Sequence, residues 1–467
     1  MKALTLVAAA CSAVLFFFGT GLTPVPALAW LAPLPVLLAA PRASGWTAGG
    51  AAFLASLVGT TNSWAFYSHS HDMPLWPWGL VGSLAFAATL LFAVLVFRGL
   101  VLRGRALLAA VCAPAVWTAV LFVIAETNPT GIMGTLATTQ ADVPVVLQTA
   151  SVLGSWGVEY LVFLVPSTLA AIASPAVSRA ARLRTGAVVA VAVTTALGLG
   201  VFRLADKESG PAQRVALVAS NQKGWAADVD TTQGRAVLAA YVDEIAALPD
   251  GVRTVVLPEA AFGSREAMPT TVSEPMRGLA KTKGFDIVVG YAHWAEHAKY
   301  NLAWTFPASG EAPIRYLKHH DTVSPAGDDL VFAPSPGVRV GVAVCMDVNF
   351  RDPSQDYAAA GAGLLAIPAS DEDDNGWQHS RTALLRGVEN GMAIAWGGRQ
   401  TTHMIADSKG RVLAEARTDG PKPFVTVVGD VATGFGPTLY TRFGDWFAWA
   451  CLALAAAGLL GCRAPRA

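Results

Sequence analysis

Residues 340–350 read VGVAVCMDVNF, an apolar run typical of a buried strand, followed by a cysteine and a short polar turn. Cys345 is one of five cysteines, and the other four lie inside or at the edge of long apolar runs. With no second cysteine nearby, a disulfide within this region is excluded. A lone cysteine on an apolar strand is most often a small buried hydrophobe. A chemical role for Cys345 therefore needs support from other parts of the sequence.

The region around this strand differs in composition from the rest of the chain. Residues 207–435 have ordinary globular composition, whereas 1–205 and 443–461 consist largely of apolar runs, and only 14% of the 467 residues are charged. A soluble domain has roughly 25% charged residues. The sequence therefore predicts an N-terminal transmembrane domain of about seven helices over 1–205, an α/β domain over 207–435 and a C-terminal transmembrane helix over 443–461. Apolar runs long enough to cross a bilayer occur at about 3–19, 25–40, 48–67, 79–97, 107–125, 154–173, 185–203 and 443–461.

The positive charges predict the orientation of these helices. With the N-terminus in the cytoplasm, the outer loops around 20–24, 68–78 and 126–153 contain no Lys or Arg. Cytoplasmic segments of membrane proteins are enriched in these residues, so the domain 207–435 is predicted to face the extracytoplasmic side. The ten Lys and Arg of the inner segments are Lys2, Arg42, Arg98, Arg103, Arg105, Arg179, Arg182, Arg184, Arg463 and Arg466.

The N-terminus also has features of a secretory signal. Lys2, an apolar stretch and Ala27-Leu28-Ala29 fit a cleavable signal peptide. The apolar stretch is long for such a peptide, and a further apolar segment follows directly, so we expect an uncleaved first helix.

Within 207–435, β-branched runs alternate with stretches of helical periodicity. This mixture predicts a layered α/β fold in which helices cover the sheets. Strands are predicted at 214–220, 254–259, 286–292, 300–306, 313–318, 338–345, 363–369, 392–398, 402–407 and 424–431, and helices at 235–248, 273–283, 353–361 and 378–390.

Three of the predicted strands end in a residue able to do chemistry, namely Glu259, Lys318 and Cys345. Each has a simpler explanation, as a solvated acid, a solvated lysine or a packed cysteine. Together they fit one mechanism, because a carboxylate can take the proton of a thiol nucleophile. A fixed ammonium can also stabilise the oxyanion that forms when a carbonyl carbon is attacked. We therefore predict that the three residues act together.

The local contexts LPEAAF (257–262), YLKHH (316–320) and VAVCMD (342–347) resemble the nitrilase superfamily of carbon–nitrogen hydrolases. The resemblance implies an αββα sandwich with Glu259 as general base, Lys318, and Cys345 as nucleophile. Further similar stretches are YN (300–301) and WQHSRTALLRGVENG (377–391). Among these hydrolases, a nitrilase-like domain between seven helices and one helix resembles the apolipoprotein N-acyltransferase family. The membrane half resembles it at WLAPLPVLLA (30–39), GWTAGGAAFLASLVGTTNSWAFY (45–67) and TQADVPVVLQTASVLGSWGVEYLVFL (139–164).

The resemblance implies transfer of an acyl chain from a phospholipid to the N-terminal cysteine amine of a lipoprotein, through a thioester at Cys345. The expected partners are a phospholipid acyl donor, a lipoprotein acceptor and membrane lipids, at the plasma (inner) membrane, without a cofactor. Zero net charge gives no support for nucleic-acid binding. Two alternatives remain open: a membrane-anchored amidase- or nitrilase-type hydrolase, and a catalytically silent homologue.

Other acids extend the predicted site. The family has a second acid in a Pro-Phe-Gly-Glu segment after its lysine; here SPAGDD (324–329) implies Asp328 or Asp329, with Asp371 as the nearest replacement. Glu159 is a further candidate, because an acid within a membrane segment is a functional-site hypothesis by default. The run His69-Ser70-His71-Asp72 has metal-ligand chemistry, but a polar loop explains it more simply, and no metal site is predicted.

Overall fold

The computed structural model describes residues 2–70, 73–206, 210–335, 337–371 and 376–463. It divides into two compact units. The helical unit comprises Met1–Asn128, Ile132–Ala205 and Phe443–Ala467, and the sandwich unit comprises Pro129–Gly131 and Asp206–Arg442.

The first sheet of the sandwich unit has the strand order β14-β1-β3-β5-β4-β2, with β6 paired to β5 and β7 paired to β6. The strands β1, β3 and β5 run parallel, and β14 closes one edge antiparallel to β1. The strands are β1 (Ala212–Ser220), β2 (Ala227–Asp228), β3 (Thr254–Val256), β4 (Phe262–Ser264), β5 (Asp286–Trp294), β6 (Lys299–Phe306), β7 (Ile314–Leu317) and β14 (Phe424–Ala432).

The second sheet has the order β13-β12-β11-β10-β9-β8. Its strands β9, β10 and β11 run parallel, with Leu364 opposite both Val340 and Ala393. Their carboxyl ends therefore meet at one edge of the sheet. The strands are β8 (Phe332–Ala333), β9 (Val340–Val342), β10 (Leu364–Ser370), β11 (Ala393–Arg399), β12 (Thr402–Ala406) and β13 (Val412–Arg417).

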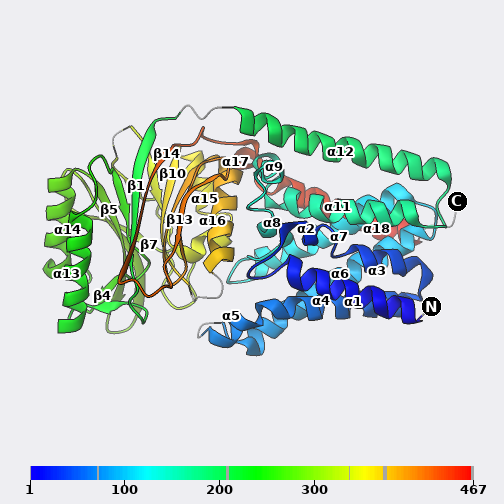
Figure 1. Cartoon of the computed structure of the whole chain (residues 1–467), viewed down its shortest axis with the longest axis horizontal. Helices are drawn as coiled ribbons and strands as arrows, with labels where there is room; N and C mark the ends of the chain where they lie inside the picture. The colour runs from blue at the N-terminus through cyan, green and yellow to red at the C-terminus, as the bar shows by residue number, and fades with distance from the viewer. Residues whose placement is uncertain (1, 71–72, 207–209, 336, 372–375, 464–467) are drawn as a thin grey trace. The chain divides into compact units, whose positions relative to one another are not determined.

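Helices cover the outer faces of the two sheets (Figure 1). On the first sheet, Leu238, Tyr241, Val272 and Met276 of α13 and α14 are buried in one apolar core with the strands. Between the sheets the backbones approach closely: a Cβ on Gly397 of β11 would lie 2.9 Å from a side-chain carbon of Val256 on β3. The unit is thus an αββα sandwich. Its helices are α13 (Thr232–Ala246), α14 (Thr270–Lys283), η4 (Cys345–Asn349), α15 (Ser354–Ala359), α16 (Gly376–Asn390) and α17 (Leu439–Phe443).

Local sequence accounts for where these elements begin and end. The Thr231 hydroxyl accepts a hydrogen bond from the Gly234 amide and caps α13. Gly284, in the left-handed conformation at φ 74°, ends α14. The central strand β10 is buried along almost its whole length, whereas β13 alternates between half-buried and exposed residues, as expected for an edge strand with one solvated face.

The strands predicted from the sequence all overlap strands of the structure, but several others were missed. The missed strands β2, β4 and β8 are two or three residues long, too short for a periodic pattern, and β13 (VLAEAR) is polar on its exposed face. Two predicted strands end earlier than expected, β3 at Val256 and β9 at Val342. Glu259 and Cys345 therefore lie on the turns that follow these strands.

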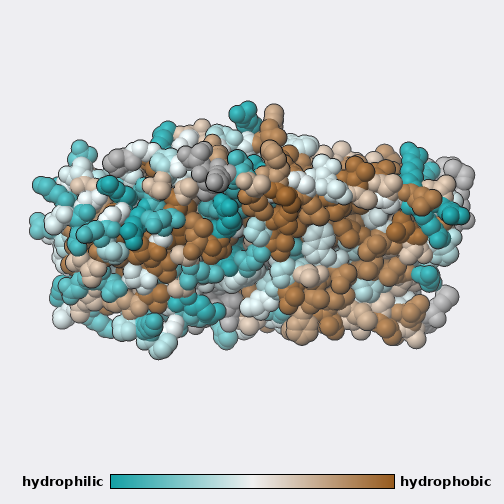
Figure 2. Space-filling model, turned by 45° about the horizontal axis from the view of Figure 1, so that its top comes forward, coloured by the Kyte–Doolittle hydropathy of each residue, from teal (hydrophilic) through white to brown (hydrophobic). Residues whose placement is uncertain are grey.

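The helical unit contains five helices that are long and apolar enough to cross a membrane, among the described residues. These spans are Leu75–Val101, Ala106–Thr127, Ser155–Ala173, Arg179–Ala205 and Trp446–Arg463. Figure 2 shows hydrophobic residues gathered over this unit. The helices are α1 (Lys2–Gly19), α2 (Pro26–Ala29), α3 (Leu34–Ala39), η1 (Ala40–Arg42), α4 (Gly45–Gly59), η2 (Thr60–Ser63), α5 (Trp64–His69), η3 (Leu75–Gly79), α6 (Leu80–Val101), α7 (Ala106–Thr127), α8 (Leu136–Thr139), α9 (Pro144–Leu147), α10 (Ala150–Leu153), α11 (Ser155–Ala173), α12 (Arg179–Ala205) and α18 (Trp446–Arg463).

The first three predicted spans differ from these long helices. The first forms α1, of 18 residues. The run 25–40 is divided into α2, α3 and η1. Each of these short helices has a proline in its first turn, and proline lacks the backbone N–H that would donate to a carbonyl of a preceding helical turn. The run 48–67 is divided at Gly59 into α4, η2 and α5.

Glu159 lies in the helical unit, on α11, and is 1% exposed. Its Oε1 accepts a hydrogen bond from the Trp117 indole N–H at 2.6 Å, and its Oε2 accepts one from the Ala137 amide at 2.7 Å. The carboxylate thereby joins α7 and the first turn of α8 to α11. Both oxygens have protein partners, which indicates a structural role.

We expect Glu159→Gln to lower the thermal unfolding midpoint of the purified protein in detergent. The glutamine amide replaces one carboxylate oxygen by an NH2 group, which would face the N–H of Trp117 or of Ala137. The lost hydrogen bond costs about 1–3 kcal/mol. Trp117→Phe should destabilise as well, and the double variant should lose less than the two single losses combined, because the two residues share one hydrogen bond. Unchanged stability of Glu159→Gln with a loss of turnover would instead indicate contact with substrate.

Candidate active site

Glu259 lies on the turn after β3, at the rim of the first sheet, and is 4% exposed. The next residue, Ala260, has φ 46°, a conformation that L-residues rarely adopt. Gly290 on β5 permits this turn to pack closely, because a Cβ there would lie 2.2 Å from the Pro258 carbonyl oxygen. The Glu259 amide also donates to the Ala369 carbonyl of β10 at 3.3 Å. Backbone contacts from both sheets therefore position the carboxylate.

Lys318 follows β7 and is 5% exposed. Its Nζ lies 2.8 Å from Glu259 Oε1 and 3.3 Å from Asp321 Oδ2. The Asn301 amide nitrogen donates to the same two oxygens, at 2.7 and 3.0 Å. One lysine, one amide and two carboxylates thus form a buried network, in which charge pairing offsets the cost of burial.

The charges of this network follow from their surroundings. Burial by itself would lower the pKa of Lys318, but Glu259, with Cys345 and Asp321, outweighs it, and the pKa is raised. Burial would raise the pKa of Asp321, yet Lys318 and two backbone amides keep it below its usual value. At neutral pH Lys318 is therefore a fixed cation, as a group that stabilises an oxyanion must be.

Cys345 begins the short helix η4 with φ 43°, so a strained turn presents the thiol at the end of β9. Its Sγ donates to the Ser370 carbonyl at 3.5 Å. Burial raises the pKa of Cys345 well above its usual value, Glu259 and Asp371 raise it further, and Lys318 opposes the rise. Cys345 therefore rests as a thiol, and a base would have to remove its proton for the sulfur to act as a nucleophile.

Asp347, two residues further along η4, holds the cysteine turn in place. It is fully buried. Its Oδ2 accepts hydrogen bonds from the Tyr316 hydroxyl at 2.7 Å and the Val344 amide at 2.8 Å, and its Oδ1 accepts one from the His320 amide at 2.9 Å. Because Tyr316 and His320 flank Lys318, this carboxylate joins the turn that carries Cys345 to the segment that carries Lys318.

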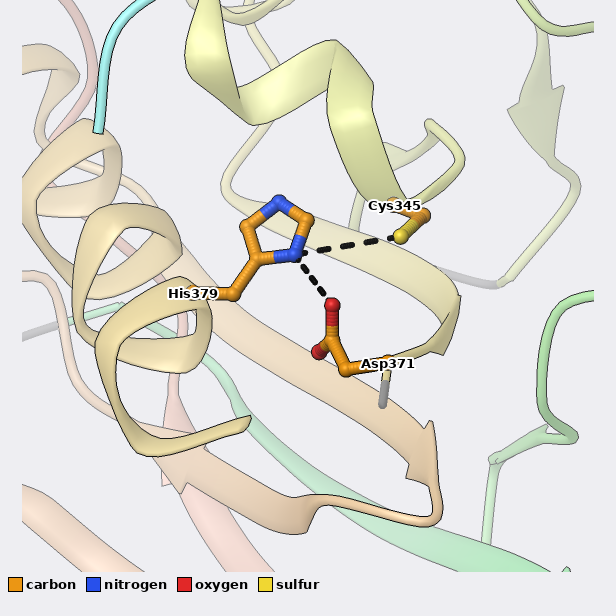
Figure 3. Close-up of side chains that lie close together, drawn as sticks. All are labelled: Cys345, Asp371 and His379. Atoms are coloured by element: carbon orange, nitrogen blue, oxygen red, sulfur yellow. Dashed lines mark hydrogen bonds and ion pairs between the residues drawn. The ribbon is translucent and has the colours of Figure 1, made fainter. Parts of the chain in front are cut away.

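A second pair of side chains lies beside the thiol (Figure 3). Asp371 follows β10 and His379 lies on α16; His379 Nδ1 is 2.6 Å from Asp371 Oδ1 and 3.9 Å from Cys345 Sγ. The three ligand atoms lie within 4.8 Å of one another. Two atoms that both bind one tetrahedral zinc ion, each about 2.0–2.1 Å from the metal, must lie further apart than His379 Nδ1 and Asp371 Oδ1 do, at 2.6 Å. The group therefore has the geometry of a hydrogen-bonded cluster.

The structure brings Glu259 and Lys318 into contact and places Cys345 within reach of both charges. The second carboxylate beside Lys318, after that of Glu259, belongs to Asp321, whereas Asp328 and Asp329 lie exposed on the surface. The sequence offered one signal for Asp321, its place three residues after the lysine. Asn301 and His379 lay in stretches similar to the family without a role assigned to them.

Two other positions considered in the sequence are not residues of the sandwich unit. Glu159 belongs to the helical unit. Of the run 69–72, His71 and Asp72 lie outside the described residues.

Comparison with known proteins gives matches over both halves of the chain. The family described as Apolipoprotein N-acyltransferase N-terminal domain matches residues 12–168, and the family described as Carbon-nitrogen hydrolase matches residues 214–432. An apolipoprotein N-acyltransferase of Geobacter metallireducens is 25% identical over 493 residues, covering 95% of this chain and 91% of the relative. Another, of Haemophilus ducreyi, is 24% identical over 348 residues, covering 66% of each chain.

Among solved structures, an amidase from Nesterenkonia sp. matches with 19% identity and a TM-score of 0.38, covering 51% of this chain and 94% of the amidase. The two family matches fall in the helical unit and in the sandwich unit, and the Geobacter metallireducens relative aligns across both. The chain therefore belongs to the apolipoprotein N-acyltransferase family, within the nitrilase superfamily of carbon–nitrogen hydrolases.

Proposed function

We propose that this protein is an apolipoprotein N-acyltransferase that moves an acyl chain from a phospholipid to the N-terminal amine of a lipoprotein, through a thioester on Cys345. Membership of the family supports the overall reaction. The observation that carries the mechanism is the buried contact between Lys318 and Glu259 at 2.8 Å, close to a thiol on a strained turn.

In the first half-reaction, Glu259 takes the proton of the Cys345 thiol as the sulfur attacks the ester carbonyl carbon of the phospholipid. The charge that develops on the carbonyl oxygen is stabilised by Lys318, whose ammonium is already in place. The carbon–oxygen bond then breaks, and Glu259 returns its proton to the leaving lysophospholipid alkoxide. The acid–base cycle is closed and the acyl chain remains on sulfur.

In the second half-reaction, the amine of the acceptor attacks the thioester carbon. The same oxyanion forms beside Lys318, the carbon–sulfur bond breaks, and Glu259 passes a proton from the attacking nitrogen to the departing thiolate. The product is an amide, and Cys345 is again a thiol.

The direct test is the mass of Cys345 after incubation with a phospholipid that carries a labelled acyl chain. We expect the acyl mass on this residue, and its transfer to a lipopeptide amine on addition of the acceptor. Release of free fatty acid at the same rate with and without acceptor would favour a hydrolase. Absence of both thioester and product would favour a silent homologue.

We further propose that the protein is a multi-pass plasma-membrane protein whose sandwich unit is extracytoplasmic. Its apolar helices and the Lys and Arg asymmetry support this orientation. A cysteine at the exposed position His297 should react with a membrane-impermeant maleimide in intact cells, in a background without other cysteines. A cysteine at the exposed position Arg179, predicted to be cytoplasmic, is the matched control and should react only after permeabilisation. The reverse pattern would contradict the orientation.

We expect Asp321→Asn to slow thioester formation roughly tenfold, equivalent to about 1.4 kcal/mol. The amide keeps the shape of the side chain but removes one of the two carboxylates that hold Lys318. The effect should fall on kcat, because the lysine acts on the transition state. Asp328→Asn and Asp329→Asn are matched controls on the exposed surface and should react like the wild type. If Asp328→Asn or Asp329→Asn slows thioester formation while Asp321→Asn does not, the second acid belongs to the SPAGDD segment (324–329).

A further inference from the structure

The proposed mechanism assigns no role to the Asp371–His379 pair, although the pair lies beside the Cys345 sulfur. Both side chains are almost fully buried, at 4% and 5% exposed. The His379 Nδ1–H donates to Asp371 Oδ1 over 2.6 Å, and the same nitrogen lies 3.9 Å from Cys345 Sγ. Figure 3 shows the carboxylate and the imidazole directed toward one another beside the sulfur.

One oxygen of this carboxylate lacks a hydrogen bond. Asp371 Oδ2 is buried and has no partner within the described part of the chain, and the same holds for His379 Nε2. A buried polar atom without a partner costs free energy. His379 fixes the orientation of the carboxylate through Oδ1 and leaves Oδ2 able to accept a hydrogen bond or a proton.

The charged groups around this pair come from several elements. Glu259 and Lys318 lie on the turns after β3 and β7, and both influence the Cys345 thiol that Asp371 also faces. Lys318 is already paired with Glu259 and Asp321. Against His379 packs the ring of Trp396 from β11, which is uncharged. Among the described residues the Asp371 carboxylate forms no ion pair with a lysine or arginine. Arg399 of β11 lies close by: its carbonyl accepts from the Asp371 amide at 3.2 Å, and its guanidinium donates to the Ser370 hydroxyl at 3.0 Å.

The two half-reactions differ in their proton balance. The first converts a thiol and an ester into a thioester and an alcohol, so the proton that leaves sulfur ends on the alcohol. The second begins with an α-amine, which at pH 7 is mostly an ammonium because its ordinary pKa is about 7.7–8.0. An ammonium has no lone pair, so it must lose a proton before attack. Glu259 is needed afterwards, to carry the second proton from nitrogen to sulfur.

We propose that Asp371, oriented by His379, is the subsite for the ammonium group of the acyl acceptor and takes the proton that this group must lose. The proposal rests on the proposed acyltransferase function. A primary ammonium complements the buried carboxylate in charge and in hydrogen-bonding capacity. Asp371 is the residue that contacts the reacting nitrogen, and His379 is a positioning residue.

The step balances as follows. The acceptor ammonium binds to the Asp371 carboxylate beside the thioester, and one N–H proton passes to Oδ2. The freed lone pair attacks the thioester carbon, the carbon–sulfur bond breaks, and Glu259 carries a second N–H proton to the thiolate. The amide leaves, and Asp371 releases its proton to water before the next cycle.

The experiment separates the half-reactions with the full-length protein in detergent or lipid nanodiscs. The thioester is first formed with a labelled phospholipid, and its decay is then followed after addition of one of two amines. One is a lipopeptide with a free α-amine, cationic at pH 7. The other is methoxyamine, which is neutral at pH 7 and needs no prior loss of a proton. The variants are Asp371→Asn and His379→Gln; Asp329→Asn controls for loss of a surface charge, and His403→Gln for loss of a buried imidazole elsewhere in the sandwich unit.

We expect Asp371→Asn to form the thioester at least as fast as wild type, since a negative charge beside the thiol is gone. Transfer to the lipopeptide at pH 7 should fall roughly tenfold, because at a pKa of about 7.7–8.0 only about one acceptor amine in ten is already neutral at pH 7. Transfer to methoxyamine should be nearly unchanged. The deficit toward the lipopeptide should shrink as the pH rises above about 8, where the acceptor is already neutral. His379→Gln should show the same pattern with a smaller loss.

Other outcomes overturn the inference. An equal loss toward both amines, or a deficit that does not change with pH, would show that the pair only supports the fold of the site. Wild-type transfer by Asp371→Asn would remove it from the reaction. If the wild-type protein itself forms no thioester, the proposed function fails, and the inference falls with it; a normal thioester with normal transfer in the variants refutes the inference alone.

Discussion

Replacing Cys345 by alanine is expected to reduce acyl transfer to the background of the assay, a loss of roughly 10⁴-fold or more, as for removal of a nucleophile in other enzymes. Cys345 is the one cysteine between residues 206 and 442, the main segment of the sandwich unit, and the alanine leaves no sulfur there able to form a thioester. The measurement is transfer of a labelled acyl chain from phospholipid to lipopeptide, with the mass of the protein recorded in parallel.

The same loss should accompany Cys345→Ser, although serine keeps a nucleophilic oxygen. Its hydroxyl is a much weaker acid than the thiol, so little alkoxide forms near neutral pH. Cys11→Ser is the matched control, because Cys11 is exposed on α1. Near-normal turnover of Cys345→Ala with an intact unfolding transition would show that this cysteine is core packing, the simpler reading of its sequence context.

Replacing Lys318 by methionine should have the second-largest effect, of about 100-fold or more on thioester formation, because the oxyanion would lose its fixed cation. This variant should also be less stable. It leaves the Glu259 carboxylate buried without its ion-pair partner, which typically costs 3–5 kcal/mol. The two measurements are single-turnover acylation of Cys345 and thermal unfolding in detergent.

A double variant separates these two effects. Lys318→Met leaves two carboxylates, Glu259 and Asp321, without their lysine. Combining it with Glu259→Gln removes one of these two charges, so part of the lost stability should return while acylation stays at the level of the worse single variant. Activity losses should not add, since the residues act as one unit. Stability and activity that recover together would mean that the pair serves the fold only.

Much of the sandwich fold was predictable from sequence, because burial leaves a local pattern. The central parallel strands read as continuous apolar runs, such as LLAIPAS in β10, and all of them were located. The short strands β2, β4 and β8 have no such pattern, since pairing with neighbouring strands defines them. In the helical unit, hydropathy located the apolar runs but not the prolines' division of 25–40 into short helices.

By itself the sequence determined the family context of the site and led to the prediction that Glu259, Lys318 and Cys345 act together, because each follows an apolar strand in a stretch similar to one enzyme family. Only the tertiary structure decided how their surroundings are built. It placed Asp321 beside Lys318, exposed Asp328 and Asp329, and brought Asp371 and His379 against the thiol. The physical reason is that the position of a strand in the sequence follows from its hydrophobic pattern. Which side chains surround a buried charge depends instead on turn conformation and on packing between segments distant in the chain.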